Sequence, residues 1–431
     1  MIWNEPIETA SREQIREIQL ERLQKQVRHA YENVPFYKKQ FDAAGLSPED
    51  IKTLEDIRKI PFTVKDDLRD HYPYGLFATP MSDIVRIHAS SGTTGKPTVV
   101  GYTKQDLDTW SECIARLVCM AGGSAEDATQ ISFGYGLFTG AFGLHYGMEK
   151  VGAAVIPMST GNTEKQLMIM QDFEPTILVS TPSYALYMSE VAAEKGIDIS
   201  KLKLRIGMFG AEGHTEEMRQ ELERRWGIVV TENYGLSEVM GPGVAGECTE
   251  HTGMHINEDH FIIEIIDPET GEPVPEGERG EVVITPLTKQ ALPLLRYRTK
   301  DISWIMQGTC ACGRKTARLH KIQGRTDDML IIKGVNVFPS QVEGVLLGID
   351  QISPQYQLII TKKDFVDAVE VRVELEDSTL VEDFKALESL QKSIQHKIHT
   401  VLGISVKVSL LEPKSLERTA GKAKRVVDLR S

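Results

Sequence analysis

The sequence is poor in cysteine and lacks an excess of positive charge. Its 431 residues include five cysteines, without the even, regular spacing of a disulfide framework. We therefore expect them to be reduced, as in the cytoplasm. Lys and Arg number 49 against 62 Asp and Glu, so the formal net charge is −13. This charge argues against a nucleic-acid partner or an anionic membrane surface.

The chain also lacks a convincing membrane-spanning segment. Residues 128–148 are uncharged and long enough to cross a bilayer, but they include five glycines and several polar residues. Residues 1–5 have neither the basic nor the apolar region of a secretory signal. We expect a cytoplasmic protein without a membrane partner, and 431 residues suffice for two or more domains.

Most of the chain reads as an α/β protein. Residues 11–31 have apolar positions at helical spacing. Short apolar runs then alternate with helical patterns, as at 153–157, 176–180 and 205–209. Such runs predict buried, mostly parallel strands. Two further strands, expected near 261–267 and 280–285 around a turn at 268–271, predict a β-rich subdomain.

The C-terminal hundred residues form a different pattern. Positions 369–375 alternate strictly, a helical stretch follows near 378–400, and a last strand is expected at 406–410. The sequence predicts a large N-terminal domain over 1–325, with mostly parallel sheets and the β-rich subdomain. A small α+β domain over 326–431 completes the predicted fold.

A loop rich in glycine and hydroxyl groups lies near residue 90. It comprises Ser90, Ser91, Gly92, Thr93, Thr94, Gly95 and Lys96. Backbone N–H groups, hydroxyls and a lysine in this order can surround a polyphosphate. The spacing is not that of a Walker A loop. The alternative is a flexible surface turn.

Five further motifs follow this loop in order along the chain. They are Gly210-Ala211-Glu212, Tyr234-Gly235-Leu236-Ser237-Glu238, Tyr297-Arg298-Thr299-Lys300-Asp301, Gly324-Arg325-Thr326-Asp327-Asp328 and Gly421-Lys422. With the loop, they resemble the signatures of adenylate-forming acyl-CoA synthetases, specifically the phenylacetate–CoA ligase group. The resemblance extends from Ile60-Pro61-Phe62-Thr63-Val64-Lys65 to residues 425–428.

The resemblance implies a two-step ligation of an aryl acid to coenzyme A. ATP first gives an acyl-adenylate and pyrophosphate, and the thiol then displaces AMP. Phenylacetate or a substituted relative is the expected acid, and a homodimer is the expected assembly. Two alternatives remain: an adenylyltransferase like the coenzyme F390 synthetases, which transfer AMP to a deazaflavin, and a nucleotide-binding regulator without catalysis.

The same resemblance assigns roles to single residues. Glu238 would hold Mg²⁺, and Lys422 would reach the carboxylate and α-phosphate oxygens. Asp327 would be the hinge of a mobile C-terminal lid, and Lys333 and Gly334 would line the thiol tunnel. The nucleotide would contact the glycine- and hydroxyl-rich loop together with Gly210, Ala211, Glu212, Asn233, Tyr234, Asp301 and Arg325. Without the other motifs, Lys422 would read as a solvated lysine in a basic tail.

Aromatic residues with interleaved glycines suggest where a flat ring would bind. The expected acyl pocket comprises Phe133, Tyr135, Gly136, Phe138, Ala211, Asn233 and Pro242. The alternative at 133–138 is an ordinary strand-to-helix turn. Phenylacetate ligases usually have tyrosine at the position of Phe133 and isoleucine at that of Asn233. Because an amide needs a polar partner, Asn233 could recognise a polar ring substituent.

Three of the five cysteines lie near histidines. Cys248, Cys310 and Cys312 with His255 would make a tetrahedral structural zinc site in the β-rich subdomain. His251 is the alternative fourth ligand, although the resemblance favours His255. The competing interpretation is a set of unconnected buried cysteines. Cys113 and Cys119 lie in a helical stretch and are expected in the core.

Overall fold

The structure is a computed structural model. It describes residues 1–90, 97–327, 330–332, 335–363, 366–378, 380, 383–419 and 421–430. The chain divides into two compact units. Unit 1 contains residues 1–180, 201–211 and 228–322, and unit 2 contains residues 181–200, 212–227 and 323–431. The predicted α/β fold class is confirmed, whereas a domain boundary at residue 325 stays a prediction.

Unit 1 begins with helices. The predicted amphipathic helix is α2 (Arg12–Asn33), which starts at a capping box between Ser11 and Gln14 and buries Leu23 and Val27. Helix α3 (Pro35–Ala44) ends at Gly45 in the left-handed conformation. The other early elements are α1 (Glu5–Glu8), η1 (Pro48–Asp50), η2 (Leu54–Lys59), α4 (Lys65–Asp70) and η3 (Met81–Asp83).

A nine-stranded mixed sheet forms the centre of unit 1, in the order β13-β14-β9-β8-β7-β6-β5-β3-β4. The strands from β4 to β7 are parallel, and those from β7 to β13 are antiparallel. The parallel strands are β3 (Ala128–Ile131), β4 (Ala154–Ile156), β5 (Ile177–Ser180), β6 (Ile206–Gly210) and β7 (Val229–Leu236). The antiparallel strands are β8 (Gly241–Glu247), β9 (Met254–Ile256), β13 (Ile305–Met306) and β14 (Arg318–Leu319).

The strands predicted near 153–157, 176–180 and 205–209 are thus β4, β5 and β6. All residues of β5 and β6 are buried, as their continuous apolar runs indicate. Residues 128–148 are not one helix: they hold β3, a connecting loop and most of α6 (Gly140–Val151). Cys113 and Cys119 are buried in α5 (Lys104–Met120), as expected.

A second, antiparallel sheet holds β10 (Phe261–Ile266), β11 (Gly280–Pro286) and β12 (Tyr297–Ser303). The predicted turn after β10 is present, and the Asp267 carboxylate accepts hydrogen bonds from the N–H groups of Glu269 and Thr270. The remaining elements of unit 1 are β1 (Arg86–Ala89), β2 (Val99–Tyr102) and α7 (Thr163–Phe173).

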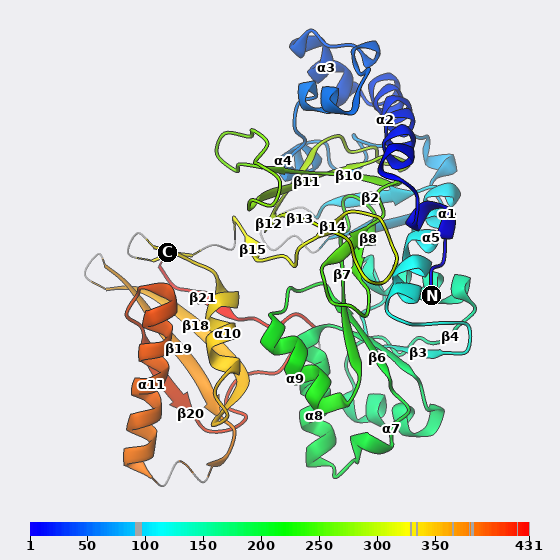
Figure 1. Cartoon of the computed structure of the whole chain (residues 1–431). Coiled ribbons are helices and arrows are strands. Elements are labelled where there is room, and N and C mark those ends of the chain that lie inside the picture. Colours follow the sequence, from blue (N-terminus) through cyan, green and yellow to red (C-terminus); the bar gives the residue numbers. More distant parts are fainter. Residues whose placement is uncertain are drawn as a thin grey trace. The chain divides into compact units, whose positions relative to one another are not determined.

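Unit 2 has its own apolar core around a four-stranded sheet in the order β20-β19-β18-β21. The two central strands are antiparallel and each outer strand is parallel to its neighbour. Helices α10 and α9 of this unit lie side by side (Figure 1). Its elements are α8 (Pro182–Glu194), α9 (Glu216–Trp226), β15 (Gly324–Arg325), β16 (Leu330–Ile332), β17 (Val335–Val337), α10 (Pro339–Leu347), β18 (Ile352–Lys363), β19 (Val366–Leu375), α11 (Phe384–Leu402), β20 (Lys407–Leu411) and β21 (Val426–Asp428). Helix η4 (Ile199–Lys201) lies where the chain leaves α8 for unit 1.

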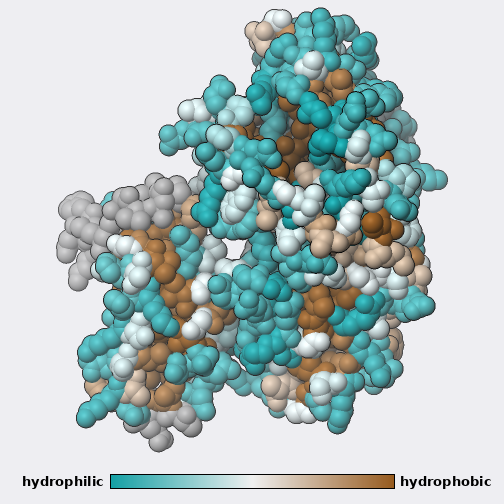
Figure 2. Space-filling view, viewed as in Figure 1, coloured by the Kyte–Doolittle hydropathy of each residue, from teal (hydrophilic) through white to brown (hydrophobic). Residues whose placement is uncertain are grey.

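The C-terminal prediction needs one correction. The strand expected at 406–410 is β20, but it is not the last, because β21 follows and pairs with β18. Lys422 therefore lies in the connection between two strands of one sheet. Among the described residues, no helix combines the length and apolar character that crossing a membrane requires. Figure 2 shows hydrophilic residues over most of the visible face.

Candidate active site

Strand β7 of unit 1 carries two of the predicted nucleotide residues at its end. Tyr234 is buried, and its hydroxyl donates to the carboxylate of Asp301 on β12 at 2.6 Å. The Asp301 N–H in turn donates to the hydroxyl of Thr299 at 3.0 Å. This arrangement fixes a carboxylate that is still 7% exposed. Such a group can accept hydrogen bonds from a vicinal diol.

Glu238 follows β7 directly and is buried to 5% exposure. Its carboxylate lies 3.7 Å from the ammonium of Lys65, at the start of α4. The neighbouring hydroxyl of Ser237 is hydrogen-bonded to Thr139 at 3.0 Å. A largely buried carboxylate of this kind can hold a hard metal ion, which prefers oxygen ligands.

The pairing of β7 with β8 depends on a residue of β7 without a side chain. A Cβ at Gly235 would lie 2.0 Å from the carbonyl oxygen of Gly241. Any other residue there would push β7 and β8 apart, which explains the glycine of the Tyr-Gly motif.

Gly210 and Ala211 form the tip of neighbouring strand β6. Ala211 has a φ of 69°, a left-handed conformation that costs energy for a residue with a side chain. A Cβ at Gly210 would lie 2.9 Å from the amide oxygen of Asn233. The Asn233 amide nitrogen donates to the carbonyl of Phe209 at 2.9 Å. One donor of this buried amide is thus satisfied within the protein.

The predicted acyl-pocket residues 133–138 lie in the loop from β3 to α6. The hydroxyl of Tyr135 is 3.0 Å from His145 Nδ1, and the ring of Phe133 packs against Gly140. Phe138 is 49% exposed. Pro242, on β8, accepts a hydrogen bond from the Trp110 indole at 2.6 Å. These contacts fix Tyr135 and Pro242 and leave Phe138 accessible.

Several predicted residues lie outside the described residues. They are Ser91, Gly92, Thr93, Thr94, Gly95, Lys96, Lys333 and Gly334. Ser90 is described, and its N–H donates to the carbonyl of Thr98 at 2.9 Å.

The remaining predicted residues belong to unit 2. Lys422 is exposed. The Glu212 carboxylate accepts hydrogen bonds from the N–H groups of Ser183 at 2.8 Å and Ala423 at 3.2 Å. Arg325 forms an ion pair with Asp327 at 2.8 Å, at the position predicted for the hinge.

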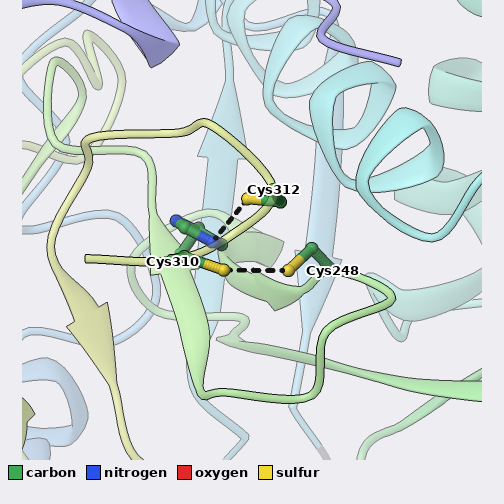
Figure 3. Close-up of side chains that lie close together, drawn as sticks. Cys248, Cys310 and Cys312 are labelled. Carbon is green, nitrogen blue, oxygen red and sulfur yellow. Dashed lines mark hydrogen bonds between the residues drawn. The ribbon is translucent and has the colours of Figure 1, made fainter. Parts of the chain in front are cut away.

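The predicted cysteine and histidine side chains come together. The ligand atoms of Cys248, His255, Cys310 and Cys312 all lie within 4.8 Å of one another. The sulfur atoms of Cys248 and Cys310 are 3.6 Å apart, and Cys312 Sγ lies 3.3 Å from His255 Nε2. Figure 3 shows the sulfur atoms of Cys248 and Cys310 facing each other, with Cys312 beside them. His255, rather than His251, belongs to this set.

Their location differs from the prediction in one respect. The cluster lies beside β8, β9 and β14, in the antiparallel half of the nine-stranded sheet, and not in the sheet of β10 to β12. The prediction was wrong because β8 and β9 extend the parallel sheet by antiparallel pairing, which the sequence order does not reveal.

The charge state of the cluster suits metal binding. Burial lowers the pKa of His255 to about 4, so its imidazole is neutral at pH 7. His255 Nδ1 is 3.0 Å from the hydroxyl of Thr316, which orients Nε2 toward the sulfur atoms. Burial raises the pKa of the Cys248 thiol, so without a cation this sulfur would keep its proton.

Sequence reasoning missed Lys65 as a site residue. It ends the segment 60–65 that contributes to the resemblance, but a lysine at the start of a helix gives no local signal of a distant partner. Only the fold brings its ammonium to Glu238, which lies 173 positions further along the chain.

Comparison with known proteins agrees with this geometry. The family model "AMP-binding enzyme" matches residues 9–286, and "AMP-binding enzyme C-terminal domain" matches residues 334–430. A phenylacetate-coenzyme A ligase of Aromatoleum evansii is 52% identical over 99% of this chain and 97% of that protein. The Escherichia coli protein of the same name is 50% identical over 99% and 98%. That of Thermus thermophilus is 46% identical over 100% of both.

Solved structures give the same result. A 2-hydroxyisobutyryl-CoA ligase in the postadenylation state matches with a TM-score of 0.95 and 29% identity, over 100% of this chain and 92% of that chain. The same ligase in the thioesterification state, with CoA, matches with a TM-score of 0.74 and 30% identity over the same shares.

Proposed function

The chain belongs to the AMP-binding enzyme family as an AMP-forming acid–thiol ligase of the phenylacetate-CoA ligase type, and we propose the substrates and roles that follow. ATP drives the ligation of an arylacetic acid, phenylacetate or a substituted relative, to coenzyme A. The carboxylate attacks the α-phosphorus and expels pyrophosphate. The thiol then attacks the acyl carbon and expels AMP.

The observation that carries this proposal is the position of Tyr234. Its hydroxyl fixes Asp301, and its strand leads within four residues to Glu238. Asp301 accepts hydrogen bonds from the two ribose hydroxyls. Glu238 holds Mg²⁺, which offsets phosphate charge when bound. Nucleotide sugar and phosphates are thereby aligned along one edge of the sheet.

Other residues complete the proposed site. The loop at 90–96 surrounds the phosphates, with Arg325 beside ribose or phosphate and Gly210, Ala211, Glu212 and Asn233 beside the adenine. Lys422 neutralises the carboxylate and α-phosphate oxygens. Rotation at Asp327 then moves Lys422 out of the active site and brings in Lys333 and Gly334, which admit the pantetheine thiol. The relative solved in postadenylation and thioesterification states supports such an alternation.

The cysteine cluster holds a structural zinc ion in this proposal. Tetrahedral zinc with Zn–S bonds of about 2.3 Å separates two sulfurs by about 3.8 Å. The Cys248–Cys310 distance of 3.6 Å fits this geometry. The ion would join the β8–β9 connection to the loop before β14. We further propose a cytoplasmic location, as the cysteine content suggests, and a homodimer, as the resemblance suggests.

The experiment is a product assay with several acids. Purified protein with ATP, Mg²⁺ and CoA should release AMP and form a thioester with phenylacetate, its hydroxylated relatives or both. Benzoate and 2-hydroxyisobutyrate serve as comparison acids. AMP transfer to a deazaflavin, with CoA inactive, would support the adenylyltransferase alternative, which four CoA ligases at 46–52% identity do not favour. ATP binding without pyrophosphate release would indicate a silent regulator.

A further inference from the structure

The backbone on both sides of Lys422 is held to the start of α8. On one side, the Thr181 hydroxyl donates to the carbonyl of Gly421 at 3.2 Å. On the other, Glu212 accepts from the N–H of Ala423 at 3.2 Å, while its second oxygen accepts from the N–H of Ser183 at 2.8 Å. Glu212 thus bridges the helix start to the three-residue segment 421–423, here called the Lys422 loop.

A second attachment lies two turns further along α8. Arg418 forms paired hydrogen bonds of 2.8 Å to the carboxylate of Glu374 on β19. Its Nε donates at 3.0 Å to Glu190 on α8. The side chains of Arg418, Glu190 and Glu374 are only 14%, 17% and 1% exposed. An arginine that joins two largely buried carboxylates has a fixed geometry, unlike most surface ion pairs.

Helix α8 also offers a weaker ion pair for comparison. Glu194 lies one turn beyond Glu190 and contacts Lys414 at 2.6 Å. Both side chains are open to solvent, at 42% and 66% exposure. Such a pair contributes little, because water screens it and both side chains lose conformational freedom.

We propose that Glu190 and Glu212 are positioning residues that hold the Lys422 loop on α8 during acid activation. This inference rests on the proposed role of Lys422. Glu190 acts through Arg418 and Glu212 acts through Ala423, so neither needs to touch the reacting atoms in this role. If Lys422 withdraws before the thiol attacks, these contacts must break. They are therefore required for the first half-reaction and not for the second.

The test separates the two half-reactions. Phenylacetate-dependent exchange of labelled pyrophosphate into ATP reports acid activation. Thioester formation from supplied phenylacetyl-adenylate and CoA reports the second step. Glu190→Ala is the main variant, because Arg418 keeps Glu374 and no nucleotide contact is assigned to Glu190. Glu194→Ala is the matched control: the same residue type, on the same helix, one turn away.

We expect Glu190→Ala to lower the exchange rate by about tenfold. This factor corresponds to the free energy that one hydrogen bond to a charged group contributes. Thioester formation should stay within about twofold of wild type, and Glu194→Ala should leave both rates within about twofold. Glu212→Gln should lower exchange in the same way. An unchanged exchange rate in Glu190→Ala, or an equal loss in both half-reactions, would overturn the inference.

Lys422→Ala separates this inference from the proposed function. If Lys422→Ala abolishes exchange while Glu190→Ala leaves the exchange rate unchanged, the positioning role alone is wrong. If exchange survives in Lys422→Ala, the proposed role of Lys422 is itself wrong, and the positioning role falls with it.

Discussion

Asn233 is the residue that we propose to recognise a polar substituent on the ring. Its amide nitrogen donates to the carbonyl of Phe209, and we propose that the second N–H or the oxygen contacts the ring substituent. We expect Asn233→Ile to shift preference toward unsubstituted phenylacetate. The ratio of kcat/KM for 4-hydroxyphenylacetate to that for phenylacetate should fall by roughly tenfold. A change of this size corresponds to the loss of one hydrogen bond to the hydroxyl group of the substrate. The same ratio in wild type and variant would show that Asn233 does not read the ring.

Lys65 forms an ion pair with the proposed magnesium ligand, with its ammonium 3.7 Å from the carboxylate of Glu238. We expect Lys65→Met to lower phenylacetate-dependent pyrophosphate exchange by roughly tenfold, because positive charge near the polyphosphate offsets repulsion in the transition state. Lys59→Met is a suitable control, since Lys59 pairs with Asp56 and not with Glu238. Equal exchange rates in both variants would assign Lys65 a structural role only.

For single residues, the sequence predicts which residues belong to the site better than it predicts which residues they contact. Tyr234, Asp301 and Glu238 could be found because short motifs contain them. The pairing of Tyr234 with Asp301, and of Glu238 with Lys65, depends on strands and helices far apart in the chain. No local pattern contains that information.

Among the elements, the connection between β8 and β9 and the loop before β14 are joined by the cysteine cluster. We expect the protein to contain one zinc ion, and Cys310→Ser to lose it and unfold at a lower temperature. Metal analysis and thermal unfolding measure these effects.

Cys119→Ala is the control for this change, because Cys119 lies in the buried face of α5 and outside the cluster. It should keep the metal even if it unfolds earlier. Wild-type protein purified without zinc, and equally stable after chelator treatment, would show that the four side chains form no metal site.

Helix α10 carries a buried carboxylate that should make stability depend on pH. Burial raises the pKa of Glu343 to about 7, although Arg425 lies 3.8 Å away; Glu212 and Glu217 raise it further. The folded state therefore holds a proton between pH 4.5 and 7 that the unfolded state releases. The contribution of this protonated carboxyl group to the stability of the folded state is fully present below pH 4.5 and is lost as the pH rises through 7.

We accordingly expect Glu343→Gln to remove this loss and to be more stable than wild type at pH 8, by about 1–3 kcal/mol. Thermal unfolding at pH 5 and pH 8 tests the difference. Glu388→Gln, at an exposed pair with Lys392 on α11, is the control. Parallel pH profiles of wild type and Glu343→Gln would contradict the expectation.

The sequence predicts elements well where burial is continuous. Strands β5 and β6 appear as unbroken apolar runs because both faces are covered. Strand β21 was missed because three residues next to a basic segment carry no alternation, and it exists only through pairing with β18. The antiparallel strands that continue the sheet beyond β7 were also missed, because the sequence of one strand does not determine the direction of its neighbour.

For the whole molecule, the order of motifs identifies the family, and the comparisons confirm it. The division into compact units is less predictable. Helices α8 and α9 precede β6 and β7 in the chain, yet they belong to the same unit as the C-terminal sheet. Contacts such as Glu190 with Arg418, 228 positions apart, produce this grouping. A pattern of local propensities does not contain such contacts.

The central claim is that the acid is activated as an acyl-adenylate and then transferred to CoA. Phenylacetate labelled with oxygen-18 in its carboxylate tests it directly, with the AMP analysed by mass spectrometry after a single turnover with ATP and CoA. Attack by the carboxylate on the α-phosphorus leaves one labelled oxygen in AMP when the thiol displaces it. AMP carrying one oxygen-18 atom is the predicted result. Unlabelled AMP beside newly formed phenylacetyl-CoA would contradict the account.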